Sequence, residues 1–352
     1  MSIPRITIAG RAISAEHSPY IIAEVSANHN GKLDIALRLI EEAKKAGADA
    51  VKLQTYTADT ITLNASTEDF QIRGGLWDGK TLYELYREAH MPWEWHRPLF
   101  EHARKVGIPI FSSPFDRTAV DLLEDLNAPA YKIASFEAVD LPLIQYVAST
   151  RKPMIISTGM ADADEIQEAV DAAREGGCKE LAILHCVSGY PAPAADYNLR
   201  TLPDMIQRFG LVTGLSDHTL DNTTAVTSVA LGASIIEKHF TLDRSAGGPD
   251  DSFSLEPREL HALCRDSKTA WEALGRVDYG RKSSEQGNAQ FRRSLYFVKS
   301  LNAGEVITED AIRSVRPGFG LPPKEANAIV GRKVLRDVLV NTPVSFDDVD
   351  GR

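Results

Sequence analysis

Two histidines, His218 and His239, lie just beyond two consecutive apolar segments of the chain. The segments 211–215 and 233–236 are short and have β-strand character, and the stretch 222–231 between them has the length and alanine content of a crossover helix. Parallel strands joined by such a helix end on the same face, so both imidazoles can point into one crevice.

Acidic residues surround both histidines. Two imidazoles with carboxylates form a mixed nitrogen and oxygen set that suits a divalent ion and leaves room for water and substrate oxygens. The carboxylates are those of Asp217, Glu237, Asp243 and Asp250. A single histidine at the end of a strand is more often a hydrogen-bonded structural residue than a ligand. Two histidines at equivalent positions of adjacent strands, both among acids, favour a metal site.

Two lysines, Lys52 and Lys132, lie within or just after short segments of β-strand character. A charged residue among the apolar residues of a strand must find a partner, which favours the binding of an anionic substrate. Hydroxyl groups follow several strands, and with the lysines they form a cradle suited to a phosphate and a carboxylate. These hydroxyls belong to Ser113, Ser135, Ser157 and Ser216. The alternative for each serine is a cap on the following helix.

Two glutamates lie near the same positions. Glu237 and His239 face the same way because alternate residues of a strand share a face, so Glu237 can exchange protons with water next to a metal ligand. Glu24 ends the first strand before a polar loop. We interpret Glu24 as a second acid or base, as a ligand of a sugar hydroxyl, or as a helix N-cap.

Eight strand and helix pairs alternate along the chain from residue 20 to residue 274. Eight such units in about 255 residues have the size and rhythm of a TIM barrel, which is an α/β fold. The predicted strands are 20–24, 50–54, 108–111, 130–134, 153–157, 181–186, 211–215 and 233–236. Gly47 ends the first of the helices, in the position where a left-handed residue is preferred.

Polar residues recur where these strands end, and in a barrel this face carries the active site. A doubly wound open sheet, the rival fold, would gather its ligand at one switch point instead. The residues are Glu24, Lys52, Ser112, Ser113, Lys132, Ser135, Ser157, His185, Ser216, His218, Glu237 and His239.

Three further segments flank or interrupt this pattern. The first 16 residues predict a short strand or hairpin that caps one end of the fold. The segment 55–95 contains three tryptophans and is too long for a plain connection, so we interpret it as a functional loop or lid. After the catalytic domain, 1–275, comes a polar linker, 276–290, and then a small domain, 291–352, which is expected to pack on a barrel.

Composition excludes several classes of protein. The net charge of −10 argues against a nucleic-acid partner. No apolar run reaches the roughly 20 residues that a membrane span needs, and no signal-like N-terminus is present. Cys178, Cys186 and Cys264 are widely spaced, which fits reduced thiols rather than a disulfide framework. We therefore expect a cytoplasmic protein with no membrane partner.

The chain resembles the sialic acid synthase family over nearly its whole length. The tail is similar to the antifreeze-protein-like (SAF) domain, whose sugar-contacting loop matches 316–320. The motifs that carry the resemblance are Ile22-Ala23-Glu24, Asn28-His29-Asn30-Gly31, Val51-Lys52-Leu53-Gln54-Thr55, Pro114-Phe115-Asp116, Tyr131-Lys132-Ile133-Ala134-Ser135, Ser157-Thr158-Gly159-Met160, Leu215-Ser216-Asp217-His218-Thr219, Ile236-Glu237-Lys238-His239-Phe240-Thr241-Leu242-Asp243 and Gly248-Pro249-Asp250.

This resemblance implies a TIM barrel with a C-terminal SAF domain, a domain-swapped homodimer, and condensation of phosphoenolpyruvate with an N-acetylated amino sugar. It assigns His218 and His239 to a Mn²⁺ or Mg²⁺ ion that holds the aldehyde oxygen, and Glu237 to proton transfer. Glu24, Tyr190 and Asp250 would position the sugar, Ser188 is a further substrate-binding candidate, and Arg316 would come from the partner subunit. Phosphoenolpyruvate would be held by Lys52, Ser113, Lys132, Ser135, Ser157 and Ser216.

Departures from the common family pattern indicate a branch. The chain has Ser135-Phe136-Glu137 and Ser188-Gly189-Tyr190-Pro191 where N-acetylneuraminate synthases commonly show Ser-Gly-Glu and Asn-x-Tyr-Pro. With the segments 74–83 and 92–96, it looks most similar to the branch that makes pseudaminic acid from 2,4-diacetamido-2,4,6-trideoxy-altrose.

The alternatives are N-acetylneuraminate or legionaminate synthesis, a metal-dependent barrel aldolase or isomerase, and a carbohydrate- or ice-binding protein. An aldolase or isomerase would release no phosphate. The binding protein is suggested by the tail alone, and it leaves the lysines and histidines of the barrel face unexplained.

Overall fold

The computed structural model describes residues 3–351. The chain divides into two compact units, Met1–Gly275 and Arg276–Arg352. Among the helices that the structure describes, none has both the length and the apolar character that a bilayer span requires.

Eight parallel strands within residues 3–275 close into a barrel, which confirms the predicted TIM fold. The order around the barrel follows the chain, and β10 closes it by pairing with both β9 and β3. The strands are β3 (Tyr20–Glu24), β4 (Ala50–Thr55), β5 (Ile110–Pro114), β6 (Tyr131–Ile133), β7 (Met154–Ser157), β8 (Leu181–Cys186), β9 (Val212–Ser216) and β10 (Ile235–His239).

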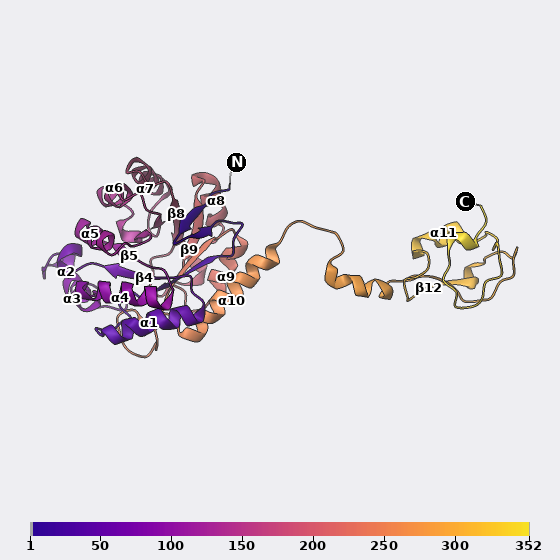
Figure 1. Cartoon of the computed structure of the whole chain (residues 1–352), viewed down its shortest axis with the longest axis horizontal. Helices are drawn as coiled ribbons and strands as arrows, with labels where there is room; N and C mark the ends of the chain where they lie inside the picture. Colours follow the sequence, from indigo (N-terminus) through magenta and orange to yellow (C-terminus); the bar gives the residue numbers. More distant parts are fainter. Residues whose placement is uncertain (1–2, 352) are drawn as a thin grey trace. The chain divides into compact units, whose positions relative to one another are not determined.

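Helices surround the strands on the outside of this unit (Figure 1). They bury one apolar face each against the sheet, as amphipathic helices of a barrel do. Gly47 ends the first of them with φ at +96°, and its N–H is bonded to carbonyls of the last turn. The helices are α1 (Leu33–Ala46), α4 (Trp93–Val106), α5 (Arg117–Asp125), α6 (Leu141–Ser149), α7 (Ala163–Glu175), α8 (Thr201–Phe209), α9 (Thr223–Ala230) and α10 (Pro257–Leu274).

A hairpin of β1 (Ile6–Ile8) and β2 (Arg11–Ile13) forms the predicted cap. Its isoleucines share a buried cluster with inward-facing residues near the amino ends of the strands, among them Tyr20 and Ile235. The hairpin therefore fills the end of the barrel opposite to the carboxyl ends of the strands.

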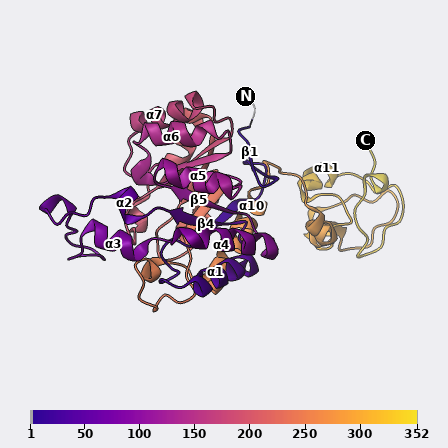
Figure 2. The same ribbon diagram turned by 60° about the vertical axis from the view of Figure 1, so that its left-hand side comes forward.

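The insertion between β4 and α4 has secondary structure of its own. It contains α2 (Ala58–Ile61), a 3₁₀ turn (Glu68–Phe70) and α3 (Leu82–Ala89), with a bridge between Gln71 and Thr81. Figure 2 shows α2 and α3 at one side of the barrel unit. Trp93 and Trp95, which the sequence analysis placed in the insertion, belong to α4 instead.

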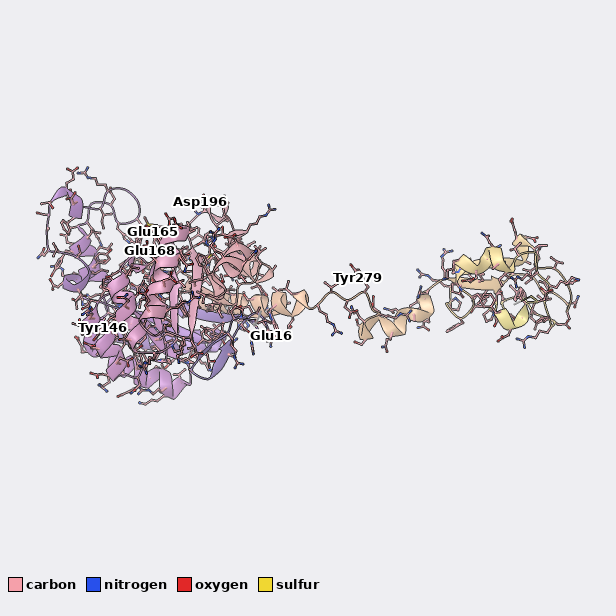
Figure 3. The ribbon with its side chains drawn as sticks, turned by 90° about the horizontal axis from the view of Figure 1, so that it is seen from above. Glu16, Tyr146, Glu165, Glu168, Asp196 and Tyr279 are labelled. Atoms are coloured by element: carbon pink, nitrogen blue, oxygen red, sulfur yellow. The ribbon has the colours of Figure 1, made fainter. Side chains whose placement is uncertain are left out.

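The second unit begins with an exposed stretch that includes Tyr279 (Figure 3), followed by a 3₁₀ helix, Ser283–Phe291. Strands β11 (Ser294–Phe297) and β12 (Ile312–Val315) pair antiparallel. Together with α11 (Ala326–Ile329) they enclose a small core. The core includes Leu295, Phe297, Ile307, Ile329, Val334 and Val344.

Candidate active site

Charged and hydroxyl side chains occupy the barrel interior at the carboxyl ends of the strands. Alternate residues of a strand share a face, so apolar residues fill the interior near the hairpin and polar ones continue the same rows toward the opposite end. The buried polar residues of this end include Glu24, Lys52, Ser113, Lys132, Ser157, Ser216, His218, Glu237 and His239. The structure thus gathers most of the predicted site into one place.

Ser112 and His185 were predicted on this face, but they do not join the site. The Ser112 hydroxyl is hydrogen-bonded to Thr55 Oγ1 at 2.6 Å, and a ring nitrogen of His185 is bonded to the Tyr197 carbonyl. Both residues stand one position away from an inward-facing residue, Ser113 or Cys186, and the period of two therefore turns them outward.

Two lysines and two glutamates form a buried charged cluster. Lys52 Nζ lies 2.8 Å from Glu24 Oε2 and 3.6 Å from Glu237 Oε1. Lys132 Nζ lies 3.8 Å from the same Glu237 oxygen. Hydroxyl groups complete the cluster: Lys52 donates to Ser113 Oγ at 3.2 Å, Lys132 donates to Ser157 Oγ at 2.6 Å, and Ser216 donates to Glu237 Oε1 at 3.1 Å.

The two carboxyl groups of this cluster differ in acidity. Burial raises the pKa of Glu24, and Lys52 offsets that effect only in part. Burial also acts on Glu237, but there Lys132 and Lys52 outweigh it and hold the pKa below its ordinary value. Neighbouring carboxyls with opposite shifts are the pattern of an acid and base pair.

A second group of hydroxyls surrounds Gly159, beyond the end of β7. Ser135 Oγ accepts a hydrogen bond from the Gly159 N–H at 3.2 Å. A Cβ atom at Gly159 would lie 2.4 Å from Ser188 Oγ and 2.8 Å from Ser135 Oγ. The Ser188 hydroxyl is buried and has no hydrogen-bond partner. Such a hydroxyl can donate to an anion, so these groups fit a phosphate next to Lys132 and Ser157.

The two predicted metal ligands are close together, with their ring centroids 5.4 Å apart. His218 Nδ1 lies 2.8 Å from the Val187 carbonyl, so Nδ1 carries a proton, and in the neutral ring Nε2 has the lone pair that a metal would bind. His239 Nδ1 is buried without a partner, 3.9 Å from Asp250 Oδ2. Burial, with the nearby positive charges, holds the pKa of His239 well below its ordinary value, which favours the neutral form that binds metals.

These donors fit a divalent ion that completes its coordination with substrate or water. In residues 3–351 no three His, Cys, Asp or Glu side chains are arranged to hold an ion by themselves. The chain therefore offers two imidazoles with a carboxylate nearby, and the remaining positions stay open to a ligand.

Aromatic rings form a wall beside the histidines. The Tyr190 ring lies 4.4 Å from the His218 ring, 5.4 Å from Phe253 and 5.9 Å from Trp77. Trp77 also donates from Nε1 to the Pro249 carbonyl at 3.1 Å. This bond ties the insertion to the loop that ends at Asp250, so the insertion borders the site as a lid would.

Asp250 and Glu24 are held by the loop and strand next to them. Asp250 Oδ2 accepts hydrogen bonds from Ser26 Oγ and, at 3.4 Å, from the Ala27 N–H. Gln54 Nε2 donates to Glu24 Oε1 at 3.0 Å and to Ser26 Oγ at 2.9 Å. The two carboxylates therefore border a common space next to the histidines.

Glu137 is a candidate site residue that was not predicted from the sequence. Burial raises its pKa to about 7, and its Oε2 atom has no hydrogen-bond partner. It follows Ser135 by two residues in a 3₁₀ turn after β6. Its place after a barrel strand was the only available signal, and the acidity depends on burial that a sequence does not show.

Arg316 is the one predicted site residue outside the barrel unit within the described part of the chain. It follows β12 and forms a cis peptide with Pro317.

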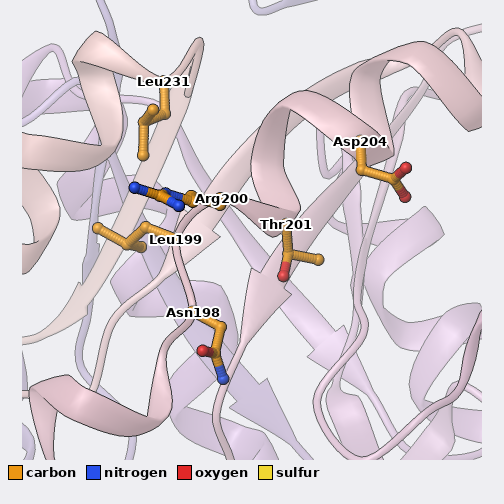
Figure 4. Close-up of a pocket in the computed structure, with 6 residues that line it drawn as sticks. All are labelled: Asn198, Leu199, Arg200, Thr201, Asp204 and Leu231. Carbon is orange, nitrogen blue, oxygen red and sulfur yellow. The ribbon is translucent and has the colours of Figure 1, made fainter.

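A separate hollow of 670 Å³ lies beside α8 on the outside of the barrel (Figure 4). Its lining includes Asn198, Arg200 and Leu231 but none of the predicted site residues.

Comparison with known proteins agrees with this geometry. Residues 39–279 match the NeuB family and residues 292–350 match the SAF domain. A pseudaminic acid synthase of Helicobacter pylori is 44% identical over 94% of this chain and 98% of its own length. A pseudaminic acid synthase of Campylobacter jejuni is 45% identical over 91% of this chain and 93% of its own length.

Solved structures give the same result. An N-acetylneuraminic acid synthetase of Leptospira borgpetersenii has a TM-score of 0.72 and 32% identity, with coverage of 82% of this chain and 96% of that one. The spore coat polysaccharide biosynthesis protein SpsE of Bacillus subtilis has a TM-score of 0.66 and 34% identity, with 99% coverage of both chains. The predicted resemblance is confirmed, and the chain belongs to the NeuB family of sialic acid synthases, with a SAF domain at its C-terminal end.

Proposed function

We propose that this protein is a pseudaminic acid synthase. It condenses phosphoenolpyruvate with 2,4-diacetamido-2,4,6-trideoxy-β-L-altropyranose and water to give pseudaminic acid and phosphate. The observation that carries the proposal is the pair of buried lysines, with hydroxyls, next to a pair of histidines and a wall of aromatic rings. The high identity to two enzymes named pseudaminic acid synthase supports this branch of the family.

Phosphoenolpyruvate has two anionic groups, and the site offers two ammonium groups with separate sets of hydroxyls. Lys132 would bind the phosphate with Ser135, Ser157 and Ser188. Lys52 would bind the carboxylate with Ser113, while Ser216 orients Glu237 between the two lysines. Fixed donors of this kind are aimed before the reaction begins, so they also stabilise charge that moves during it.

In the reaction, C3 of phosphoenolpyruvate forms a bond to the aldehyde carbon of the open-chain sugar. The aldehyde oxygen takes up a proton, and positive charge develops at C2. Glu24 suits the role of proton donor because its pKa is raised by burial. A Mn²⁺ or Mg²⁺ ion bound by His218 and His239 would polarise the aldehyde carbonyl.

Water then adds to C2, and Glu237 suits the role of base because the two lysines favour its charged form. The bond from C2 to the phosphate oxygen breaks, the hydroxyl proton leaves with the phosphate, and C2 becomes the ketone of the product. The atoms balance with water as the only further reactant.

The sugar would lie between Glu24 and Asp250 on one side and the aromatic wall of Tyr190, Trp77 and Phe253 on the other. A 6-deoxy sugar with two acetamido groups presents methyl groups to such a wall. An N,N′-diacetyllegionaminic acid synthase of Campylobacter jejuni is also 37% identical to this chain, so the legionaminate and neuraminate reactions are the alternatives that a test must separate.

The test is phosphate release from phosphoenolpyruvate with Mn²⁺, with the 2,4-diacetamido sugar and N-acetylmannosamine offered in parallel. We expect release with the first sugar only, and loss of release when a chelator is added. Release with N-acetylmannosamine alone would refute the pseudaminic branch and favour the neuraminate one. Release that survives chelation would refute the metal assignment.

We further propose a domain-swapped homodimer in which Arg316 of one subunit reaches the site of the other. The resemblance to the family and the location of Arg316 in a separate unit support this arrangement. Mixing inactive Lys132→Met subunits with inactive Arg316→Ala subunits should restore activity, because one site of each mixed dimer is then complete. If Arg316 served its own barrel, every mixed site would lack one of the two residues and the mixture would stay inactive.

A further inference from the structure

Lys238 is a buried charge for which the proposed reaction has no use. Its side chain is 1% exposed, and it lies on β10 between Glu237 and His239. Because alternate residues share a face, Lys238 points away from the site, on the same side as Ile236 of the core between sheet and helices. An ammonium group in such surroundings is unfavourable unless other groups bind it.

The turn after β9 supplies these groups. Lys238 Nζ donates to Asp217 Oδ2 at 2.8 Å, to the Thr219 carbonyl at 2.7 Å and to the Asp221 carbonyl at 2.9 Å. The Asp217 carboxylate also accepts the Thr219 N–H at 2.9 Å. The turn therefore wraps around the ammonium group, and His218 lies inside this turn.

The opposite side of His218 is held by the loop after β8. Its N–H donates to the Tyr197 hydroxyl at 2.6 Å, and its carbonyl accepts from the Ala192 N–H at 3.1 Å. The imidazole donates to the Val187 carbonyl at 2.8 Å. Two contacts connect the His218 turn to the strand that carries His239: the Asp217 N–H donates to the Glu237 carbonyl at 2.9 Å, and Lys238 is the side chain of that strand that binds the turn.

We propose that Lys238 is a positioning residue that sets the distance between the two imidazoles. Strand β10 presents His239 toward the barrel interior. The adjacent side chain, Lys238, points to the opposite face of the strand and binds the turn that contains His218. The inference rests on the proposed function, in which both histidines bind the divalent ion. Residues that orient metal ligands typically change metal affinity by roughly 10- to 100-fold when they are replaced.

The test compares Lys238→Met combined with Asp217→Asn against the unchanged chain. The double substitution removes the ammonium group without leaving a charged carboxylate buried. Mn²⁺ affinity is measured by electron paramagnetic resonance without substrates, phosphoenolpyruvate affinity by calorimetry, and folding by circular dichroism. Lys152→Met is the matched control, since Lys152 also pairs with a carboxylate, Glu124 at 2.6 Å, but does not contact the His218 turn.

We expect the dissociation constant for Mn²⁺ to rise roughly 10-fold or more in the double variant and to stay unchanged in the control. Phosphoenolpyruvate affinity should stay within a few-fold, because the lysines that bind it come from other strands. Unchanged Mn²⁺ affinity in a folded variant would overturn the inference. An equal loss of both affinities would also overturn it, because it would indicate general damage.

If the double variant does not fold, Asp217→Asn alone decides the question. This substitution keeps the shape of the side chain and the two carbonyl contacts of Lys238. We therefore expect a smaller loss of Mn²⁺ affinity than in the double variant. An unchanged Mn²⁺ affinity would contradict the inference. Failure of the unchanged chain to bind Mn²⁺ would refute the metal part of the proposed function, and the inference with it. If the unchanged chain binds Mn²⁺ and the variant binds it more weakly, the result supports both the metal site and the role of Lys238.

Discussion

Gly159→Ala should block the proposed phosphate site while it leaves the barrel folded. The new Cβ atom would lie 2.4 Å from Ser188 Oγ and 2.8 Å from Ser135 Oγ, which is closer than such atoms approach in proteins. Both oxygens end short side chains that can rotate, so the two closest contacts are relieved by moving the hydroxyls. The third contact, 3.2 Å to Ser135 Cβ, requires a shift of a few tenths of an ångström. Gly159 has no positive φ angle, and alanine therefore adds no backbone strain.

The expected loss follows from these two hydroxyls. A hydrogen bond to a charged group contributes roughly 1.5 to 3 kcal/mol, so two of them displaced from a phosphate amount to about 3 kcal/mol or more. Since 1.36 kcal/mol corresponds to a factor of ten, kcat/KM for phosphoenolpyruvate should fall roughly 100-fold. Most of the fall should appear in the KM for phosphoenolpyruvate, and the KM for the sugar should change little.

Gly189→Ala is the matched control for this prediction. Its Cβ atom would meet Ala192 at 3.5 to 3.6 Å, an ordinary contact, although Gly189 directly follows Ser188. Steady-state kinetics with each substrate varied, together with thermal unfolding, separate binding from folding. A folded Gly159→Ala enzyme with an unchanged KM for phosphoenolpyruvate would refute the assignment of these hydroxyls to the phosphate.

Three further results are expected. Glu237→Gln should lower kcat by roughly 100-fold or more, because a proposed base is lost, while phosphoenolpyruvate still binds in calorimetry; full activity would exclude Glu237 as the base. Burial raises the pKa of Glu137 to about 7, so the folded state binds this proton more tightly than the unfolded state does, and stability should fall as pH rises from about 4.5 to about 7. Urea unfolding at pH 5 and pH 8 should show a lower free energy of unfolding at pH 8 in the unchanged chain, and a smaller difference in Glu137→Gln. Equal differences in the two proteins would contradict the raised pKa of Glu137. Trp77→Ala should lower kcat/KM for the 2,4-diacetamido sugar roughly 10-fold, because an aromatic contact is lost, and leave the KM for phosphoenolpyruvate unchanged. A changed KM for phosphoenolpyruvate with an unchanged kcat/KM for the sugar would place Trp77 away from the sugar.

The barrel was predictable because its signals are local and repeated. Each strand is a short apolar run, each helix has its own end signal such as Gly47, and polar residues recur where the strands stop. The period of two along a strand also predicts that Glu237 and His239 face the same way. The same rule, applied to each strand in turn, would have excluded Ser112 and His185 from the site.

The remaining features depend on contacts between distant parts of the chain. The hydroxyls of Ser135 and Ser188 meet at Gly159 only because three different loops converge there. The bond from Trp77 to the Pro249 carbonyl spans 172 residues, and no spacing in the sequence announces it. The elevated pKa of Glu137 reflects burial, which is a property of the folded structure.

The insertion between β4 and α4 separates recognition of the sugar from binding of phosphoenolpyruvate. The lysines and serines that would bind phosphoenolpyruvate stand on barrel strands or immediately after them, and changing them would disturb the barrel or its shared chemistry. The insertion borders the site through Trp77, whose ring lies next to Tyr190 and whose Nε1 donates a hydrogen bond to the Pro249 carbonyl. Exchange of this segment is therefore expected to change the preference for the sugar, while the groups proposed to bind phosphoenolpyruvate stay in place.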